Sequence, residues 1–211
     1  MVLVPTLQWE SEFWNDGQLR IAGVDEVGLG CLAGPIVAAA VLLPVNPVPI
    51  ALVRDSKTLS AVQRQKAFGL IQQQALKIGL GLATVREIEQ VNVLQASYLA
   101  MRRAIARIQP IDHALVDGRS ISVDLGIPIT TFIKGDAQSY AIACASIVAK
   151  VRRDRLMQRL ARRYPGYGWE RNAGYGTRQH LEGIQARGIT PWHRKTYAPI
   201  QAAIEQLNLF D

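Results

Sequence analysis

Short apolar runs separated by turn-forming residues divide the chain into an alternating series of strands and helices. Uninterrupted apolar residues predict strands over 19–26 and 36–43, which a glycine-rich turn joins into a hairpin. Further strands are expected over 79–85, 113–117 and 129–133, and helices over 61–77, 93–108, 138–164, 178–187 and 194–207. This order indicates an α/β fold with a mixed central β-sheet flanked by helices and a C-terminal helical extension.

Individual residues mark several of the predicted helix ends. Ser60 is a favourable N-cap for the helix over 61–77, and Pro165 terminates the long helix. In the helix over 93–108, one face carries the apolar residues Leu94, Tyr98, Met101 and Ile105.

The chain has 211 residues, 49% of them hydrophobic, which is enough to bury the core of one domain with an appendage. Its formal net charge of +7 favours an anionic partner, either nucleic acid or an acidic membrane surface. The uncharged stretch 28–53 is long enough to span a bilayer, but prolines interrupt it and leave only 36–43 as a continuous apolar run. We therefore expect a soluble protein that does not enter a membrane.

Cysteine usage and the first residues bear on the compartment. Only Cys31 and Cys144 are present, which excludes a disulfide framework and a CxxC metal site and fits a reducing cytoplasm. The chain begins with Glu10, Glu12 and Asp16 among its first residues, which does not match a secretory signal. We expect a cytoplasmic protein.

Three acidic residues, Asp25, Asp117 and Asp136, lie at or just beyond the ends of apolar β runs. If these strands are neighbours in the sheet, their ends meet at one edge, and Glu26 can join them where its strand breaks into the glycine turn. Taken singly, Asp117 before Gly118 also fits a turn, and Asp136 also fits a helix N-cap. Taken together, they predict a cluster of four carboxylates.

Four clustered carboxylates need compensation, because like charges within a few Å raise one another's pKa. Ligation by oxygen alone favours Mg²⁺ or Mn²⁺, and two such ions roughly 3.5–4 Å apart are the usual apparatus for cleaving a phosphodiester. A zinc site is not expected, because no metal-binding spacing relates His113, His180 and His193. An acidic pocket on a basic protein is the combination that a nuclease requires.

The glycines after the acidic doublet do not form a nucleotide-binding loop. Gly28, Gly30 and Gly34 do not match the GxGxxG spacing, and Pro35 precedes a strand and not a helix. A loop of this kind either makes a tight hairpin or lets the backbone come very close to a bound molecule.

Six motifs occur in the order found in one known family. They are GVDEVGLGCLAGP from residue 23, DSKTLS from 55, VDGR from 116, KGD from 134, ASIVAKVRRDRLM from 145 and GYGT from 174. In these motifs the chain, from about residue 19 to 199, is similar to ribonuclease HII of bacteria. The resemblance implies a ribonuclease H-like fold and a metal-dependent endoribonuclease.

By this resemblance, the enzyme hydrolyses the RNA strand of RNA–DNA hybrids and cuts 5′ of ribonucleotides embedded in duplex DNA. The products carry 3′-hydroxyl and 5′-phosphate ends, and the activity serves ribonucleotide removal in DNA replication and repair. The catalytic and metal-binding residues are then Asp25, Glu26, Asp117 and Asp136, which hold two divalent ions, Mg²⁺ or Mn²⁺.

The resemblance also implies substrate-binding residues. The family reads the ribose 2′-hydroxyl with a Gly-Arg-Gly turn, which here is Gly28-Leu29-Gly30, so Leu29 offers no cation and we expect retained activity with weaker binding or poorer junction discrimination. Tyr175 corresponds to a tyrosine that stacks on the sugar beside the scissile site, although it would also fit packing on a helix capped by Thr177. The pair Ser56 and Lys57 corresponds to residues near the substrate phosphates, although Lys57 also fits a solvated surface charge.

Two segments suggest macromolecular contacts. Basic residues crowd the second half of the long helix, from Lys150 to Arg163, where some would follow the duplex backbone and make binding salt-dependent. The tail Gln206–Phe210, QLNLF, resembles the pentapeptide by which bacterial proteins dock on the sliding clamp, but it would also fit packing of the last helix.

These observations predict an N-terminal extension over 1–18, a catalytic core over 19–164 and substrate-contacting loops and helices over 165–211, in a monomer. Two other functions are compatible with an acidic cluster on this fold. One is a different metal-dependent nuclease such as a junction resolvase, and the other is a protein that binds hybrids without cutting them.

Overall fold

The computed structural model describes residues 4–54, 56, 58–119 and 124–208. The chain forms two compact units that are interleaved in sequence. The first unit consists of Met1–Val27, Val37–Leu82 and Tyr98–Val151, and the second of Gly28–Ile36, Ala83–Ser97 and Arg152–Asp211. The contiguous division at residues 18 and 164 stays a prediction.

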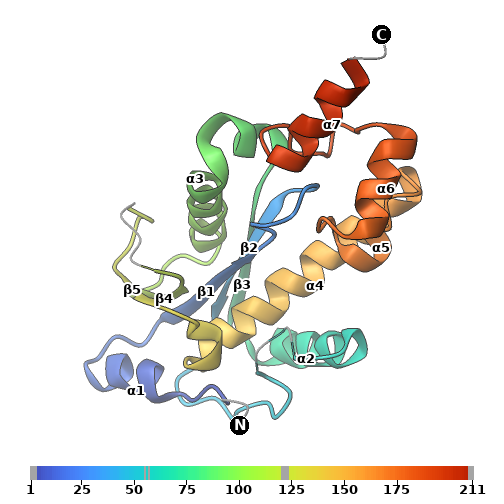
Figure 1. Cartoon of the computed structure of the whole chain (residues 1–211). Coiled ribbons are helices and arrows are strands. Elements are labelled where there is room, and N and C mark those ends of the chain that lie inside the picture. Colours follow the sequence, from blue (N-terminus) through green and yellow to red (C-terminus); the bar gives the residue numbers. More distant parts are fainter. Residues whose placement is uncertain (1–3, 55, 57, 120–123, 209–211) are drawn as a thin grey trace. The chain divides into compact units, whose positions relative to one another are not determined.

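One helix and a strand hairpin come first, helices and strands then alternate, and the chain after the last strand is helical (Figure 1). In chain order they are α1 Gln8–Asn15, β1 Ile21–Val27, β2 Ile36–Leu42, α2 Ala61–Gln74, β3 Lys77–Ala83, α3 Val85–Ala106, β4 His113–Asp117, β5 Ile129–Phe132, the 3₁₀ turn η1 Gly135–Ala137, α4 Tyr140–Arg163, α5 Trp169–Asn172, α6 Arg178–Arg187 and α7 Ala198–Asn208. No helix among the described residues is long and apolar enough to cross a membrane.

The described strands form one mixed sheet in the order β3-β2-β1-β4-β5. Strands β1 and β2 pair antiparallel, from Ala22 opposite Leu42 to Val27 opposite Val37, which confirms the predicted hairpin. Strand β4 runs parallel to both β1 and β5. This mixed sheet, with helices packed on it, confirms the predicted fold class.

Side-chain alternation gives β1 one face toward the start of α4. Ile21 on that face packs with Leu115 and Ile142, and the next residue of the same face, Gly23, lies directly against the α4 backbone. A Cβ atom on Gly23 would overlap the carbonyl group of Ala141, so the close approach of strand and helix requires glycine there. The third residue of this face is Asp25, which therefore lies under α4.

The N-terminal helix α1, which the sequence pattern did not predict, fixes the start of α4. The buried Glu10 carboxylate accepts hydrogen bonds from the Ser139 hydroxyl (2.6 Å) and the Ala141 amide (2.8 Å). Burial raises the pKa of Glu10, and the hydrogen bond from Ser139 opposes that rise. Trp14 on the same helix packs on Phe132 and its apolar neighbours.

The second unit has a core of its own that is unusually polar. Apolar residues from the glycine loop, the second half of α4, α5, α6 and α7 pack together, including Leu32, Met157, Trp169, Ile184 and Ile200. Four polar side chains with no exposed surface lie in the same unit: Arg153, His180, His193 and Arg194.

Helix α2 ends earlier than predicted, and helix α7 begins later. Helix α2 ends at Gln74 and not near 77, because Lys77 already belongs to β3. Helix α7 begins at Ala198 and not at 194, and the Arg194 amide ahead of it donates to the Leu32 carbonyl (2.9 Å). The prediction that Ser60 is the N-cap of α2 is confirmed, since Ser60 and Gln63 form a reciprocal capping box.

Helix α3 starts earlier than the predicted residue 93. The Thr84 hydroxyl accepts from the Glu87 amide (3.2 Å) and the Glu87 carboxylate accepts from the Thr84 amide (2.8 Å), a second capping box that the sequence contained. The helix then breaks at Asn92, whose φ is +69°. Leu94, just after the break, is 51% exposed, so its placement on the apolar face was wrong.

Candidate active site

The predicted convergence of strand ends is confirmed for the first unit. Asp25 on β1 and Asp117 at the end of β4 lie on adjacent parallel strands, each one residue beyond the paired Val24 and Val116. Asp136 lies in η1, directly after β5, which is the next strand of the sheet. Because parallel strands end at the same edge, the three carboxylates share that edge.

Asp25 is the most strongly perturbed of these groups. It is only 5% exposed, and burial, followed by the charges of Glu26 and Asp117, raises its pKa well above the ordinary value. Two hydrogen bonds that the carboxylate accepts oppose the rise, one from the Ser146 hydroxyl on α4 and one from the Glu26 amide to Asp25 Oδ1 (2.7 Å). Like charges are thus held close together in a poorly solvated position.

The residue before Asp136 binds Asp117 through its backbone amide. Gly135 donates its N–H to Asp117 Oδ1 (2.6 Å), and the next residue along the chain is the buried Asp136. The interpretation of Asp136 as a helix N-cap is wrong. That position belongs to Ser139, whose hydroxyl accepts from the Ile142 amide (3.2 Å).

Glu26 is not at a simple strand end. Strand β1 continues to Val27, and its ladder with β2 pairs Glu26 with Ala38. Only on the β4 side does the pairing stop before the doublet, at Val24 opposite Val116. The doublet therefore lies at the rim of the β1–β4 pair but within the β1–β2 pair, and the predicted break of the strand at Glu26 was wrong.

The donor set suits a hard divalent cation. All four predicted ligands are carboxylates, and the charges of Glu26 and Asp117 add to burial in raising the pKa of Asp25, a rise that its two hydrogen bonds offset only in part. Among the described residues, no three Asp, Glu, His or Cys side chains are already arranged to hold a metal ion. Two of the carboxylates instead bind backbone amides, and the metal-ligand roles stay a prediction.

Ser56 is buried behind Asp25. Its hydroxyl lies 3.0 Å from that of Ser146, so a chain of hydroxyl groups leads from Ser56 to the Asp25 carboxylate. Arg64 donates to the Ser56 carbonyl (3.0 Å) and fixes this segment. The prediction for Lys57 lies outside the described residues.

The predicted substrate-reading residues of the second unit lie together. Gly28 has φ +105°, which only glycine adopts readily, and Leu29 after it is 37% exposed. Cys31 and Tyr175 form an isolated antiparallel bridge, and a Cβ on Gly30 would lie 3.9 Å from the Tyr175 ring. Thr177 caps α6 as expected. Tyr175 is 43% exposed, so packing on that helix does not bury it.

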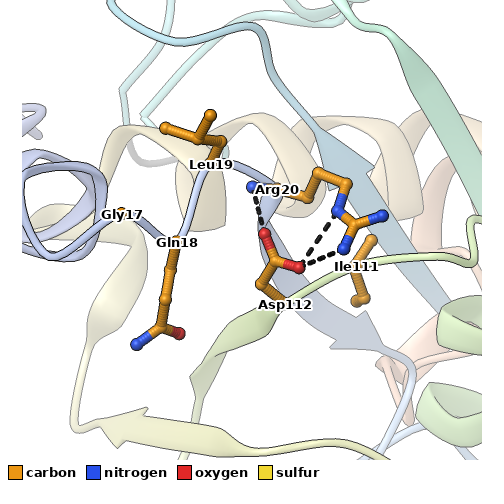
Figure 2. A pocket seen from close by; sticks show the side chains of 6 residues that line it. All are labelled: Gly17, Gln18, Leu19, Arg20, Ile111 and Asp112. Carbon is orange, nitrogen blue, oxygen red and sulfur yellow. Dashed lines mark hydrogen bonds and ion pairs between the residues drawn. The ribbon is translucent and has the colours of Figure 1, made fainter.

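A surface pocket of about 780 Å³ is lined by residues 17–20, Ile111 and Asp112 (Figure 2). Its lining includes Arg20, which donates from its amide and side chain to Asp112. These residues precede β1 and β4, at the opposite ends of the strands from Asp25 and Asp117. The pocket is therefore separate from the candidate site.

Two groups of this site were missed from the sequence. Ser146 lies among small residues of a helix and has no local signal of its own. Arg153, one of the basic residues between Lys150 and Arg163, has no exposed surface, so it is not among those that can follow the duplex backbone. A long run of basic residues does not show which member faces inward.

Known proteins of one family are similar to this chain over most of its length. The family model described as ribonuclease HII matches residues 22–199. Ribonuclease HII of Thermosynechococcus vestitus is 57% identical over 192 residues, which cover 91% of this chain and 90% of that protein.

Solved structures show the same fold. The ribonuclease H2 of Pyrococcus horikoshii OT3 is 26% identical with a TM-score of 0.74, covering 90% of this chain and 99% of that one. The structure of Bst-RNase HIII in complex with Mn²⁺ is 20% identical with a TM-score of 0.68, covering 90% of this chain and 70% of that one. The chain belongs to the ribonuclease HII family, whose members are divalent-metal-dependent endoribonucleases that act on RNA–DNA hybrids.

Proposed function

We propose that the enzyme cuts 5′ of a ribonucleotide embedded in duplex DNA and that Asp25, Glu26, Asp117 and Asp136 hold its two divalent ions, Mg²⁺ or Mn²⁺. The observation that carries this proposal is the crowding of buried carboxylate charge around Asp25 at one edge of the sheet. Two bound ions would supply an activated water and stabilise the leaving oxygen, giving 3′-hydroxyl and 5′-phosphate ends.

The surrounding residues hold the carboxylates in place. Ser146 binds the Asp25 carboxylate from α4, and the Gly135 amide binds Asp117. A carboxylate oxygen has more than one lone pair, so a carboxylate held by such donors keeps acceptor capacity for a cation. In the second unit, the Gly28–Gly30 turn would read the ribose 2′-hydroxyl, and Tyr175 would stack on the neighbouring sugar.

The cellular setting is also a proposal. We infer a cytoplasmic monomer that removes ribonucleotides during DNA replication and repair. Support comes from Cys31 and Cys144, which are both buried and are not joined in a disulfide, as suits a reducing compartment.

We infer in addition that the tail Gln206–Phe210 docks on a sliding clamp. Gln206 is exposed in the last turn of α7. The side chains of Leu207 and the residues after it lie outside the described residues. The support is the QLNLF pattern itself, in which a glutamine precedes spaced apolar residues.

A cleavage assay tests the catalytic proposal. A labelled duplex with one ribonucleotide, an all-DNA duplex and a four-way junction are incubated with Mg²⁺ or Mn²⁺. We expect a single metal-dependent cut 5′ of the ribonucleotide, and a loss of at least about a hundredfold in rate for Asp25→Asn. Asp112→Asn is the matched control, because Asp112 is paired with Arg20 at the other end of the strands.

Three results would contradict the proposal. They are preferential cutting of the junction, binding of the duplex without any cut, and equal activity of Asp25→Asn and the wild type. The first would favour a resolvase, and the second a protein that only binds hybrids.

A further inference from the structure

Two arginines without exposed surface, Arg153 and Arg194, lie in the core of the second unit. Such cations are costly to bury unless a negative charge or several hydrogen bonds compensate them. Within the described part of the chain, neither forms an ion pair, and their donors go to backbone carbonyls and to one tyrosine hydroxyl. The Leu29 carbonyl lies in the turn that the proposed function assigns to substrate reading, and the other carbonyls lie just after that turn or just before Tyr175.

Arg153 joins the glycine loop to the segment before Tyr175. Its Nε donates to the Pro35 carbonyl (2.9 Å) and its Nη2 to the Ala33 carbonyl (3.0 Å), both in the loop. Its Nη1 donates to the Ala173 carbonyl (2.7 Å). A Cβ on Gly28 would collide with this guanidinium group, which explains the need for glycine at that position.

Arg194 holds the centre of the turn. Its Nε and Nη2 both donate to the Gly34 carbonyl (3.0 and 2.9 Å), and its Nη1 donates to the Leu29 carbonyl (2.9 Å). The Tyr197 hydroxyl donates to the same Leu29 carbonyl (2.7 Å). The Leu29 carbonyl is therefore fixed toward the inside of the unit by two donors.

This orientation determines where the next amide points. In a trans peptide the N–H is directed opposite to the preceding C=O, so the Gly30 N–H points away from Arg194. Within the described residues that N–H binds no acceptor, and a Cβ placed on Gly30 meets nothing closer than the Tyr175 ring at 3.9 Å. A backbone donor without a protein acceptor, close to the buried charge of Arg194, favours an oxygen acceptor of the substrate, most strongly one that carries negative charge.

We propose that Arg153 and Arg194 are positioning residues for ribonucleotide recognition. Arg194 fixes the Gly30 amide beside Tyr175, and Arg153 joins the loop after the turn to the segment before Tyr175. Their buried charge favours a substrate phosphate next to the turn, which Leu29 cannot do with its own side chain. The inference rests on the proposed function for the identity of the substrate. Neither guanidinium group touches the substrate, because both are buried.

The test compares Arg194→Met, Arg194→Lys and Tyr197→Phe with the wild type on a duplex with one ribonucleotide. We expect Arg194→Met to raise KM roughly tenfold with kcat changed less than about twofold, as for loss of one charge-assisted hydrogen bond. Arg194→Lys, which keeps the charge, should recover part of that loss. Tyr197→Phe, which removes only the hydroxyl, should raise KM about threefold.

Arg171→Met is the matched control, because the Arg171 side chain is 81% exposed and its replacement removes the same unit of charge. The affinity of each variant for the ribonucleotide duplex and for the all-DNA duplex is also measured by fluorescence anisotropy in the presence of chelator. This measurement needs no cleavage. If the wild type does not cut, the proposed function fails, and the anisotropy data still decide whether the arginines affect ribonucleotide preference.

The inference is overturned if Arg194→Met loses kcat only in proportion to its folded fraction while KM and ribonucleotide preference stay at wild-type values. It is also overturned if Arg171→Met raises KM as much as Arg194→Met does. If Arg194→Met does not fold, Tyr197→Phe decides, and an unchanged KM and preference for that variant count against the inference.

Discussion

The charged Asp25 side chain lowers the stability of the fold in which it lies. Its carboxylate is buried next to two like charges, and two hydrogen bonds offset only part of that cost. An asparagine there would keep the shape and the acceptor oxygen but not the charge. Activity and stability should therefore move in opposite directions at this residue.

We predict that Asp25→Asn raises the midpoint of thermal unfolding by several degrees in chelator, equivalent to about 1 kcal/mol. Because the folded-state pKa of Asp25 is raised, its penalty grows as pH rises from the ordinary value through the raised one, so the difference should be larger at pH 8 than at pH 5. Thermal melts at both values check this. A lower midpoint for Asp25→Asn than for wild type at pH 8 would contradict it, and Asp112→Asn should show no such gain.

Some residues of the site could be identified from the sequence, and others could not. Asp25 and Asp117 could be identified because an acid at the end of an apolar strand breaks a pattern. Ser146 and Arg194 could not, because their importance comes from what lies opposite them in space. The local sequence around a serine in a helix of small residues, or around an arginine in a basic segment, does not indicate that the side chain is buried.

Strands were predicted better than helices at the scale of elements. The range of β4 matches its prediction because a short apolar run bounded by polar residues has few alternative boundaries. The start of α3 was missed although Thr84 and Glu87 have the spacing of a capping box. Its break at Asn92 depends on backbone conformation, which apolar spacing does not report.

A buried histidine network connects α5, α6 and the segment 190–193. The Thr190 amide donates to His193 Nδ1 (2.8 Å), so His193 Nε2 carries a proton and donates to His180 Nε2 (3.1 Å). That nitrogen also accepts from the Trp169 indole (2.9 Å). His180 must then donate from Nδ1 to the Tyr175 carbonyl (2.9 Å), so the network needs both rings neutral.

We predict that acid weakens this network. Burial, together with the neighbouring His180, lowers the pKa of His193 to about 4, against 6.5 for the ordinary group. The unfolded chain binds the proton first, so stability falls as pH drops from 6.5 to 4, by on the order of 2 to 3 kcal/mol. Urea unfolding of wild type and His193→Gln across this range checks it. Equal pH slopes for the two proteins would show that His193 does not contribute.

At the scale of the whole molecule, the sequence indicated an anionic partner and an α/β fold, and both agree with membership of the ribonuclease HII family. It did not indicate two units interleaved along the chain. Such a division depends on the glycine loop packing with residues more than a hundred positions away, as in the bond from Arg194 to Leu29. Local pattern does not encode contacts of that range.

The tail gives a prediction for the whole molecule. Removing Gln206–Asp211 should abolish binding to a bacterial sliding clamp and leave cleavage of the ribonucleotide duplex unchanged, because the described catalytic and substrate-reading residues lie elsewhere. Surface plasmon resonance against immobilised clamp and the cleavage assay check the two halves. Clamp binding that survives the deletion would rule out the tail as the docking segment.

The hydrogen bonds between the Glu10 carboxylate and the start of α4 have a practical consequence for the preparation of this enzyme. A shortened version that lacks α1 would leave the Ala141 amide without its acceptor and expose the apolar surface under Trp14. Asp136 lies only a few residues ahead of that helix end. Trimming the first helix should thus damage catalysis from a distance, and affinity tags belong before it, never in its place.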